Sequence, residues 1–228
     1  MTRAVLFDLD GVLLDSKQAV LTTLAGVATA ALGRRITVAD LPSDAVTTPR
    51  VEVLSALGVT EPDELCETWW DVALATAMGT RLFPGVMEGL VALKEAGAAT
   101  GLVTLQRRSR LAWLLPPAAL DLLDTTVCRE DAAPKPAPDG IFLALARLAV
   151  APHDAVFIGD TLTDRAAADQ AGICFAGAGW GYAGPDALAA VGCQVVLSEP
   201  SEIGPGLLCL SPGAQVWHRR PASYAKRS

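Results

Sequence analysis

The sequence predicts an α/β protein whose core is a doubly wound, mostly parallel sheet, with a helical insertion after the first strand. In the second half of the 228-residue chain, short apolar runs typical of buried strands alternate with segments typical of helices. Residues 16–81 lack any strand-like alternation, and prolines and glycines break them into helical pieces. Apolar residues make up 51% of the chain, which is enough for a large globular core.

The first strand is expected at residues 4–7, an apolar run that ends directly at Asp8. Ser16 is a suitable N-cap for a helix over residues 17–32, and Gly33 ends that helix. The later elements are a helix ending at Gly97, strands at 98–104, 124–128, 155–158, 173–176 and 194–197, and helices at 139–148 and up to residue 171. This alternation favours a parallel sheet with helices on both faces.

These elements divide the chain into three parts. Residues 1–15 and 82–200 form the predicted α/β core, and residues 16–81 form the helical insertion. Residues 201–228 are expected to be mostly loop, because Gly204-Pro205-Gly206 and Pro212-Gly213 favour turns.

The charge distribution argues against one class of partner. The net charge is −7, and every acidic residue lies at or before Glu202. An acidic body argues against nucleic-acid binding. The last stretch is basic, and it is expected to be a solvated terminus; its charged residues are Arg219, Arg220, Lys226 and Arg227. No oligomeric state is predicted.

The sequence indicates a cytoplasmic protein. It has no run of about 18 apolar residues, so no membrane span is expected. Two acids, Asp8 and Asp10, follow the N-terminal apolar run, which is unlike a signal peptide. The cysteines lie far apart without any Cys-x-x-Cys pair, which is typical of reduced, mostly buried thiols; they are Cys66, Cys128, Cys174, Cys193 and Cys209.

Polar residues that can carry chemistry follow four of the apolar strands. They are Asp8 with Asp10, Thr104, Lys135, and Asp160 with Asp164. Because the carboxyl ends of parallel strands meet at one edge of a sheet, these side chains are expected to converge there. Two close carboxylates repel each other, and keeping both ionised usually requires a cation between them.

These residue types suit phosphoryl transfer. An aspartate carboxylate can attack phosphorus and form an aspartyl-phosphate, and Mg²⁺ held by carboxylates would neutralise the phosphate charge. Lys135 and the Thr104 hydroxyl would hold the phosphoryl oxygens. A second acid, for which Asp10 is suited, would protonate the leaving oxygen and then activate water.

The motifs resemble those of a known family. Phe7-Asp-Leu-Asp-Gly-Val12, then Thr104, Lys135-Pro136 and Gly159-Asp-Thr-Leu-Thr-Asp164 resemble, in order, the four motifs of the haloacid dehalogenase superfamily. The likeness covers about residues 1–200 and includes Phe83-Pro-Gly-Val86. It points to the phosphoglycolate-phosphatase-like branch, which implies a Rossmann-like core with residues 16–81 as a small helical cap.

The resemblance implies a role for each motif residue. Asp8 would be the nucleophile and Asp10 the general acid and base. Mg²⁺ would be bound by the Asp8 side chain, the Asp10 backbone carbonyl and Asp160, and Asp164 would support this site. The implied activity is hydrolysis of a small phosphomonoester, such as phosphoglycolate or a sugar phosphate. From the residues alone, Asp160 could instead cap the following helix, and Asp164 could be solvated in its first turn.

Arg50 is a candidate for binding a phosphate or carboxylate of the substrate, because guanidinium pairs with both groups in bidentate fashion. Its position resembles that of a cap arginine in related mutases, although a surface role is an open alternative. Of the adjacent Trp69 and Trp70, one is expected in the core, because neighbouring helical residues face different ways. Trp180 and Tyr182 are expected either to flank the site or to pack against the core.

One departure from the family concerns the residues after Thr104. Relatives commonly have asparagine or another small polar residue there, whereas this chain has Leu105 and Gln106. Because the Thr104 hydroxyl is kept, the departure is expected to affect the binding of phosphate or the shape of the pocket. Two lone histidines, His153 and His218, are expected at the surface.

Two alternative functions remain open at this level. A phosphosugar mutase of the β-phosphoglucomutase type would share the aspartyl-phosphate, but such relatives carry Glu-Asp where this chain has Gly159-Asp160. A non-catalytic metabolite-binding protein would not need the intact Asp8, Asp10 and Lys135. A dehalogenase is disfavoured, since relatives with that activity lack the second aspartate.

Overall fold

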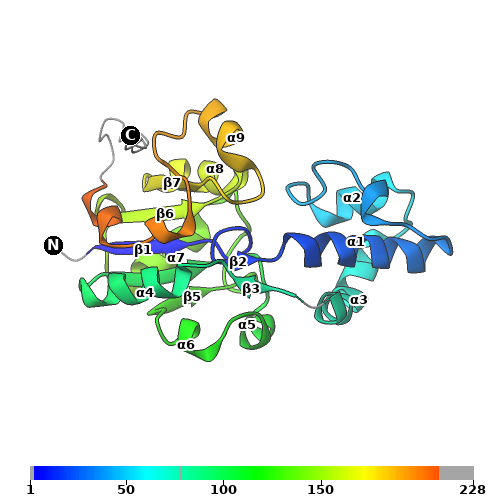
Figure 1. The fold of residues 1–228 in the computed structure, drawn as a ribbon, viewed down its shortest axis with the longest axis horizontal. Helices are drawn as coiled ribbons and strands as arrows, with labels where there is room; N and C mark the ends of the chain where they lie inside the picture. Colours follow the sequence, from blue (N-terminus) through cyan, green and yellow to red (C-terminus); the bar gives the residue numbers. More distant parts are fainter. Residues whose placement is uncertain (1–2, 78, 211–228) are drawn as a thin grey trace, which may run out of the picture.

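A computed structural model describes residues 3–77 and 79–210. Within them, one six-stranded sheet has the strand order β5-β4-β1-β6-β7-β8, and every pair of neighbours is parallel (Figure 1). The strands are β1 (Ala4–Phe7), β4 (Ala99–Val103), β5 (Thr125–Val127), β6 (Ala155–Gly159), β7 (Cys174–Ala178) and β8 (Val196–Leu197). The predicted fold class is confirmed.

Alternation along β1 divides its side chains between two cores, one on each face of the sheet. Val5 and Phe7 enter one core, and Ala4 and Leu6 enter the other. The first face is covered by α4 (Val86–Glu95), α5 (Arg108–Leu114) and α6 (Pro117–Leu120). The second face is covered by α7 (Asp139–Leu148), α8 (Leu162–Ala171) and α9 (Gly184–Ala190). All four residues of β1 are buried, as expected of a central strand.

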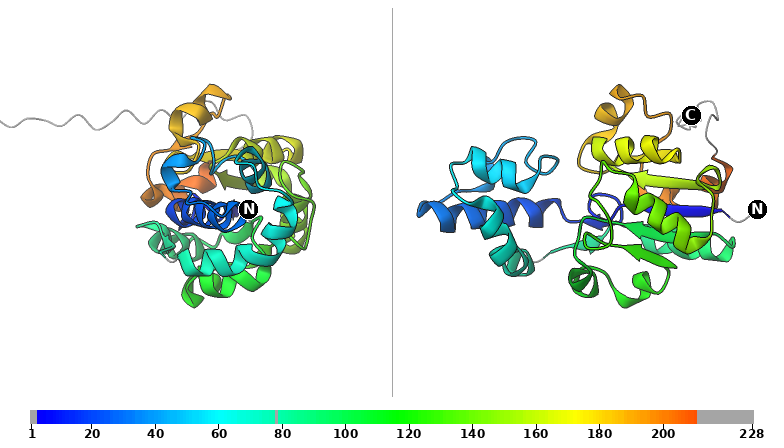
Figure 2. Two further views of the ribbon diagram at one scale, coloured as in Figure 1. Left: turned by 90° about the vertical axis from the view of Figure 1, so that its right-hand side faces the viewer. Right: turned by 180° about the vertical axis from the view of Figure 1, so that it is seen from behind.

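A separate helical body lies beyond the carboxyl ends of the strands (Figures 1 and 2). It consists of α1 (Lys17–Leu32), α2 (Arg50–Ala56), α3 (Pro62–Ala77) and a short 3₁₀ helix (Val38–Asp40). These elements enclose their own hydrophobic cluster, which includes Leu24, Leu54 and Trp70. Trp70 is 4% exposed and Trp69 is 57% exposed, so one of the two adjacent tryptophans is in the core, as predicted.

Two very short strands join the helical body to the sheet. β2 (Leu14–Asp15) leaves the sheet for α1, and β3 (Arg81–Leu82) returns, and the two pair antiparallel. The chain therefore crosses between the two bodies twice, side by side. Ser16 is the N-cap residue of α1, as predicted, but its side chain makes no capping hydrogen bond, because its hydroxyl donates to Asp10.

The segment after residue 200 is more ordered than the turn-forming residues predict. It contains 3₁₀ helices at Pro200–Glu202 and Pro205–Cys209, and Ile203 and Leu207 are buried in the first core. Proline occupies an early position in both short helices, where its missing N–H costs nothing. Residues 211–228, with the basic tail and His218, lie outside the described residues.

The cysteines of the described residues are all free thiols. Cys66 and Cys128 are buried, Cys174 and Cys193 are half-buried, and Cys209 is exposed. No helix in the described part of the chain has both the length and the apolar character needed to cross a bilayer.

Ile203→Ala tests whether the segment after residue 200 belongs to the core. Because Ile203 is 2% exposed, the substitution is expected to lower the free energy of unfolding by about 2–5 kcal/mol. Denaturant unfolding followed by circular dichroism measures this, with Cys209→Ala, an exposed neighbour, as the control. A loss no larger than that of the control would show that the segment is dispensable for folding.

Candidate active site

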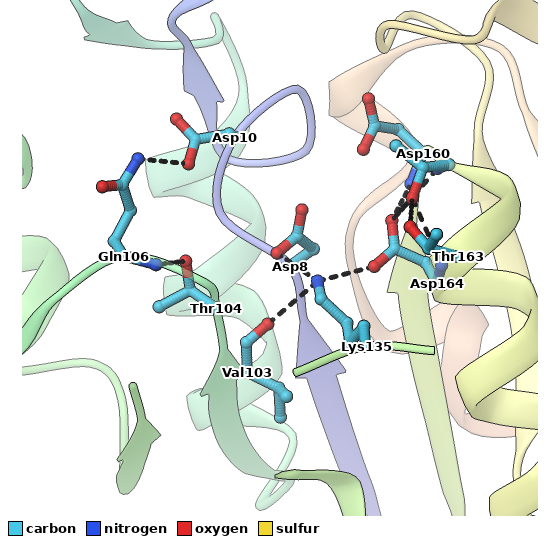
Figure 3. Close-up of polar contacts among 10 residues, drawn as sticks. Asp8, Asp10, Val103, Thr104, Gln106, Lys135, Asp160, Thr163 and Asp164 are labelled. Carbon is cyan, nitrogen blue, oxygen red and sulfur yellow. Dashed lines mark hydrogen bonds and ion pairs between the residues drawn. The ribbon is translucent and has the colours of Figure 1, made fainter. Parts of the chain in front are cut away.

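The candidate site lies where β1 ends between β4 and β6. In an open parallel sheet, ligands usually bind at the carboxyl ends of the strands, next to the strand at which the strand order reverses. Asp8 follows β1 directly, and its N–H donates to the carbonyl of Ile158 at 2.9 Å. Thr104 follows β4, and Asp160 follows β6. The predicted residues of these strands therefore meet at one edge of the sheet (Figure 3).

Lys135 reaches this edge from the loop after β5 and binds two of the carboxylates. Its Nζ lies 2.6 Å from Asp8 Oδ1 and 2.6 Å from Asp164 Oδ1, and it also donates to the Val103 carbonyl at 3.3 Å. Although burial by itself lowers the pKa of Lys135, the carboxylates of Asp164 and Asp8 raise it above its ordinary value. The ammonium group is therefore held in its charged form.

Asp160 and Asp164 are held together at the start of α8. The Asp160 N–H donates to Asp164 Oδ2 at 3.2 Å, and the same oxygen accepts the Thr161 N–H at 3.0 Å and the Thr161 hydroxyl at 2.5 Å. Asp164 thus closes a capping box with Thr161, a stable N-terminus for α8. Asp160 Oδ2 accepts the N–H of Tyr182 at 2.6 Å, while its Oδ1 is buried without a hydrogen-bond partner in the described residues.

Three carboxylates crowd around a single lysine. One oxygen from each of Asp8, Asp160 and Asp164 lies within 4.8 Å of the others. Burial raises the pKa of Asp8 to about 7, with Lys135 opposing and Asp164 adding to the rise. Burial raises the pKa of Asp160 well above its ordinary value, and repulsion from Asp164 and Asp8 adds to this. The unpartnered Asp160 oxygen and this donor set suit a hard divalent cation.

Two glycines make room for Asp160. A Cβ atom at Gly11 would lie 2.2 Å from Asp160 Oδ2, and Gly11 also has a φ of +81°. A Cβ atom at Gly181 would lie 2.2 Å from the Cβ of Asp160. Any side chain at either position would displace the carboxylate, so the backbone encloses it closely from two loops.

Asp10 points away from the lysine and toward a different set of partners (Figure 3). Its Oδ1 accepts the Ser16 hydroxyl at 2.6 Å, and its Oδ2 accepts the Gln106 side-chain amide at 2.7 Å. Ser16 in turn shares a hydrogen bond with the Tyr182 hydroxyl. Burial, and then the nearby Asp10 carboxylate, raise the pKa of Tyr182, so the phenol stays neutral. Each Asp10 oxygen therefore has a fixed donor.

The departure after Thr104 has a structural outcome. Leu105 is exposed, whereas Gln106 turns inward and its N–H donates to the Thr104 hydroxyl oxygen at 3.1 Å. Thr104 itself is buried at the end of β4. Gln106 thus contacts both the Thr104 hydroxyl and the Asp10 carboxylate.

Three contacts of the site are not predicted by the sequence. Ser16, expected to cap a helix, and Gln106, expected only as a departure from the family, both donate to Asp10. Tyr182, expected either to flank the site or to pack, donates its N–H to Asp160. A signal for Ser16 was present, since it follows the first motif closely in the chain. Trp180 has a structural contact, donating its indole N–H to the Val12 carbonyl at 3.1 Å.

Arg50 lies apart from the carboxylates, at the start of α2. Its guanidinium stacks 4.8 Å from the centre of the Trp70 ring, and burial lowers its pKa. Its charged neighbours include Arg110 and Arg129 of the sheet body and Glu67 of α3. Arg50 therefore sits where the helical body faces the sheet. His153 is exposed, as expected, with Asp154 3.6 Å away.

The fold and motifs belong to a known class of enzyme. The sequence profile described as "Haloacid dehalogenase-like hydrolase" matches residues 5–178. The chain therefore belongs to the haloacid dehalogenase-like hydrolase family. The resemblance seen in the motifs is confirmed, and so is the prediction that the chain is an enzyme.

Individual relatives narrow the comparison. The chain is 34% identical over 189 residues to a phosphoglycolate phosphatase from Nitrosospira multiformis, covering 75% of this chain and 80% of the relative. It is 29% identical over 205 residues to the pyrophosphatase PpaX from Bacillus velezensis, covering 88% and 94%. The structure of a proposed phosphoglycolate phosphatase from Lactobacillus plantarum superposes with a TM-score of 0.77 at 28% identity, over 89% of this chain and 98% of that one.

Asp160→Asn tests the repulsion among the carboxylates. It is expected to raise the Tm of chelator-treated protein, and to raise it more at pH 9 than at pH 6, because burial and repulsion raise the pKa of Asp160 and disfavour its carboxylate form as the pH rises. The amide carries no charge, and its oxygen still accepts the Tyr182 N–H. Each kcal/mol of stabilisation corresponds to about 2–4 °C for a chain of this size. Thermal unfolding measures the shift, and Asp186→Asn, exposed on α9, should leave Tm unchanged. A lower Tm for Asp160→Asn would contradict the repulsion.

Proposed function

We propose that this chain is a Mg²⁺-dependent phosphatase that hydrolyses a small phosphomonoester, of the phosphoglycolate or sugar phosphate type, through an aspartyl-phosphate on Asp8. One observation carries the proposal. The Asp8 carboxylate lies at the end of the central strand, with Lys135 2.6 Å away and with two further carboxylates within 4.8 Å. Similarity to a phosphoglycolate phosphatase supports the substrate class.

Asp8 is the proposed nucleophile. Its Oδ1 is held by Lys135, which orients the carboxylate and leaves the other oxygen for attack. The attacking oxygen forms a bond to phosphorus as the ester oxygen leaves. Lys135 and the Thr104 hydroxyl hold the non-bridging phosphoryl oxygens, where charge accumulates in the transition state.

Asp10 is the proposed general acid and base. Protonated, it gives its proton to the leaving ester oxygen in the first step. As a carboxylate, it then takes a proton from the water that attacks the aspartyl-phosphate, which releases inorganic phosphate and restores Asp8. Such proton transfer contributes about 10²–10⁴-fold to the rate. Its two hydrogen bonds, from Ser16 and Gln106, keep the carboxylate in one orientation between the two steps.

The proposed metal site uses the Asp8 side chain, the Asp10 backbone carbonyl and Asp160, with Asp164 in support. The buried Asp160 Oδ1, which has no partner among the described residues, is available as a ligand. Mg²⁺ bound there would offset the carboxylate charges and the charge of the phosphoryl group. Asp164 keeps Lys135 and the start of α8 in place beside it.

Residues 16–81 are the proposed cap, and residues 1–15 and 82–200 are the proposed catalytic core of a cytoplasmic enzyme. The cap faces the carboxyl ends of the strands (Figure 1), so its closure would exclude bulk water from the site. Arg50 faces the core from the cap, which suits it to bind a second anionic group of the substrate, a carboxylate or phosphate.

Asp8→Asn tests the nucleophile. Phosphate release from a panel of small phosphomonoesters, with Mg²⁺ present, is expected to fall by at least about a hundredfold, because an amide cannot attack phosphorus. Asp186→Asn is the control, and a circular dichroism spectrum shows whether each variant is folded. Release by the wild type without Mg²⁺, or by Asp8→Asn at more than about 1% of the wild-type rate, would overturn this mechanism.

Arg50→Ala tests the proposed contact with a second anion. It is expected to raise KM for phosphoglycolate or a sugar bisphosphate by about tenfold, and to change KM for phenyl phosphate much less, since that ester has no second anion. Steady-state kinetics on both substrates measure the difference. Arg35→Ala, an exposed arginine of the same helical body, is the control. Equal changes for both substrates would assign Arg50 a purely structural role.

A further inference from the structure

A continuous series of polar contacts runs from Asp10 to the helical body. The Gln106 Nε2 donates to Asp10 Oδ2 at 2.7 Å, and the Gln106 Oε1 accepts from Arg110 Nη1 at 2.8 Å. The other Nη atom of Arg110 forms an ion pair with Asp71 of α3. Two side chains of the core thus connect the proposed acid and base to the proposed cap.

We propose that Gln106 and Arg110 are positioning residues for Asp10, and that Asp71 of the cap completes their arrangement. In this proposal Asp10 is held ready for proton transfer only while α3 is docked on the core. It rests on the proposed function, because it assigns these residues to the acid-base step of that reaction.

The chemistry of the three groups fixes the direction of each hydrogen bond. A guanidinium only donates and a carboxylate only accepts, so Gln106 must turn its oxygen to Arg110 and its NH₂ to Asp10. The amide therefore has one orientation in this setting. Without Arg110, the amide has no such restraint, and its NH₂ is no longer directed at Asp10.

Burial makes the contact with Asp71 important for Arg110. The Arg110 side chain is 2% exposed, and Asp71 is 43% exposed. A buried guanidinium without a nearby carboxylate is costly, because it has lost its hydration without a counter-ion. When α3 moves away, Arg110 loses that carboxylate, and its favoured position changes. The position of the cap therefore affects the orientation of Gln106, and through it the orientation of Asp10.

The Asp71 contact belongs to a wider interface between α3 and the core. Glu67, four residues before Asp71 and so on the same side of the helix, forms ion pairs with Arg107 and Arg129. Three core arginines therefore meet two acids of one helix face. Of these arginines, only Arg110 bonds to the side chain of Gln106, whereas Arg129 donates its backbone N–H to the Gln106 carbonyl. Glu67 therefore provides a second variant that weakens docking of α3 without removing the ion pair between Asp71 and Arg110.

Two esters with different leaving groups can show whether Gln106 positions Asp10 or has only a general structural role. An alkyl phosphate has a poor leaving group that needs the proton of Asp10, whereas 2,4-dinitrophenyl phosphate releases a stable anion and needs it little. Rapid mixing of enzyme with excess ester and Mg²⁺ measures release of the alcohol or phenol in the first step. This readout is separate from hydrolysis of the aspartyl-phosphate.

Gln106→Leu is expected to slow release of the alcohol at least about tenfold, and release of the dinitrophenol by less than about threefold. Asp71→Asn should show the same selectivity, and Glu67→Gln, which weakens docking of the same helix but leaves Asp71 in place, should show it to a smaller extent. Because Asp71 acts through Gln106, the double variant should be no slower on the alkyl ester than Gln106→Leu alone. Thermal unfolding shows whether each variant is folded, and Asp71→Asn is the milder test, because the Asp71 side chain is 43% exposed whereas that of Arg110 is 2% exposed.

Equal slowing of both esters by Gln106→Leu, or additive effects of Gln106→Leu and Asp71→Asn, would overturn the positioning role. These outcomes differ from failure of the proposed function, in which the wild type itself releases no phosphate from either ester and both proposals fall.

Discussion

The rest of the structure depends on the burial of three carboxylates, Asp8, Asp160 and Asp164, against one ammonium group. Lys135 contacts two of them, and Asp160 keeps an oxygen without a hydrogen-bond partner among the described residues. Several negative charges in a site of low polarity repel one another strongly, and a single lysine does not offset them. This excess of negative charge suits the cation proposed for this edge of the sheet.

The loops and the helix around the carboxylates hold them in place, and this restricts which residues can occupy the neighbouring positions. Gly11 and Gly181 allow the backbone to approach Asp160 more closely than any side chain would permit, and Asp164 both caps α8 and holds Lys135. Asp10 is kept out of the cluster, with donors of its own from Ser16 and Gln106. The two aspartates of the first motif are two residues apart in the chain but lie in different electrostatic environments, which suits two different roles.

The fold class and the convergence of the motif residues could be predicted from the sequence, because both follow from local patterns. The apolar run that stops at Asp8 shows where the first strand ends, and the carboxyl ends of parallel strands lie at the same edge of a sheet. The interaction of Gln106 with Asp10 and the contact of Arg110 with Asp71 could not be predicted, since they depend on how α3 docks. The position of Ser16 at the start of α1 could be predicted, but its contact with Asp10 could not, because a serine hydroxyl serves equally well as a helix cap and as a donor to a carboxylate. The burial of Ile203 arises from long-range packing that its glycine- and proline-rich surroundings conceal.

The most direct test of the central claim is a calorimetric titration of Mg²⁺ into chelator-treated protein, in buffers of different ionisation enthalpy. Burial places the pKa of Asp8 at about 7, so a cation that favours the charged carboxylate should displace protons at pH 7. One saturable site per chain is expected, with proton release at pH 7 that decreases at pH 9, where Asp8 is already ionised. Absence of saturable binding, or binding without proton release at pH 7, would contradict the central claim.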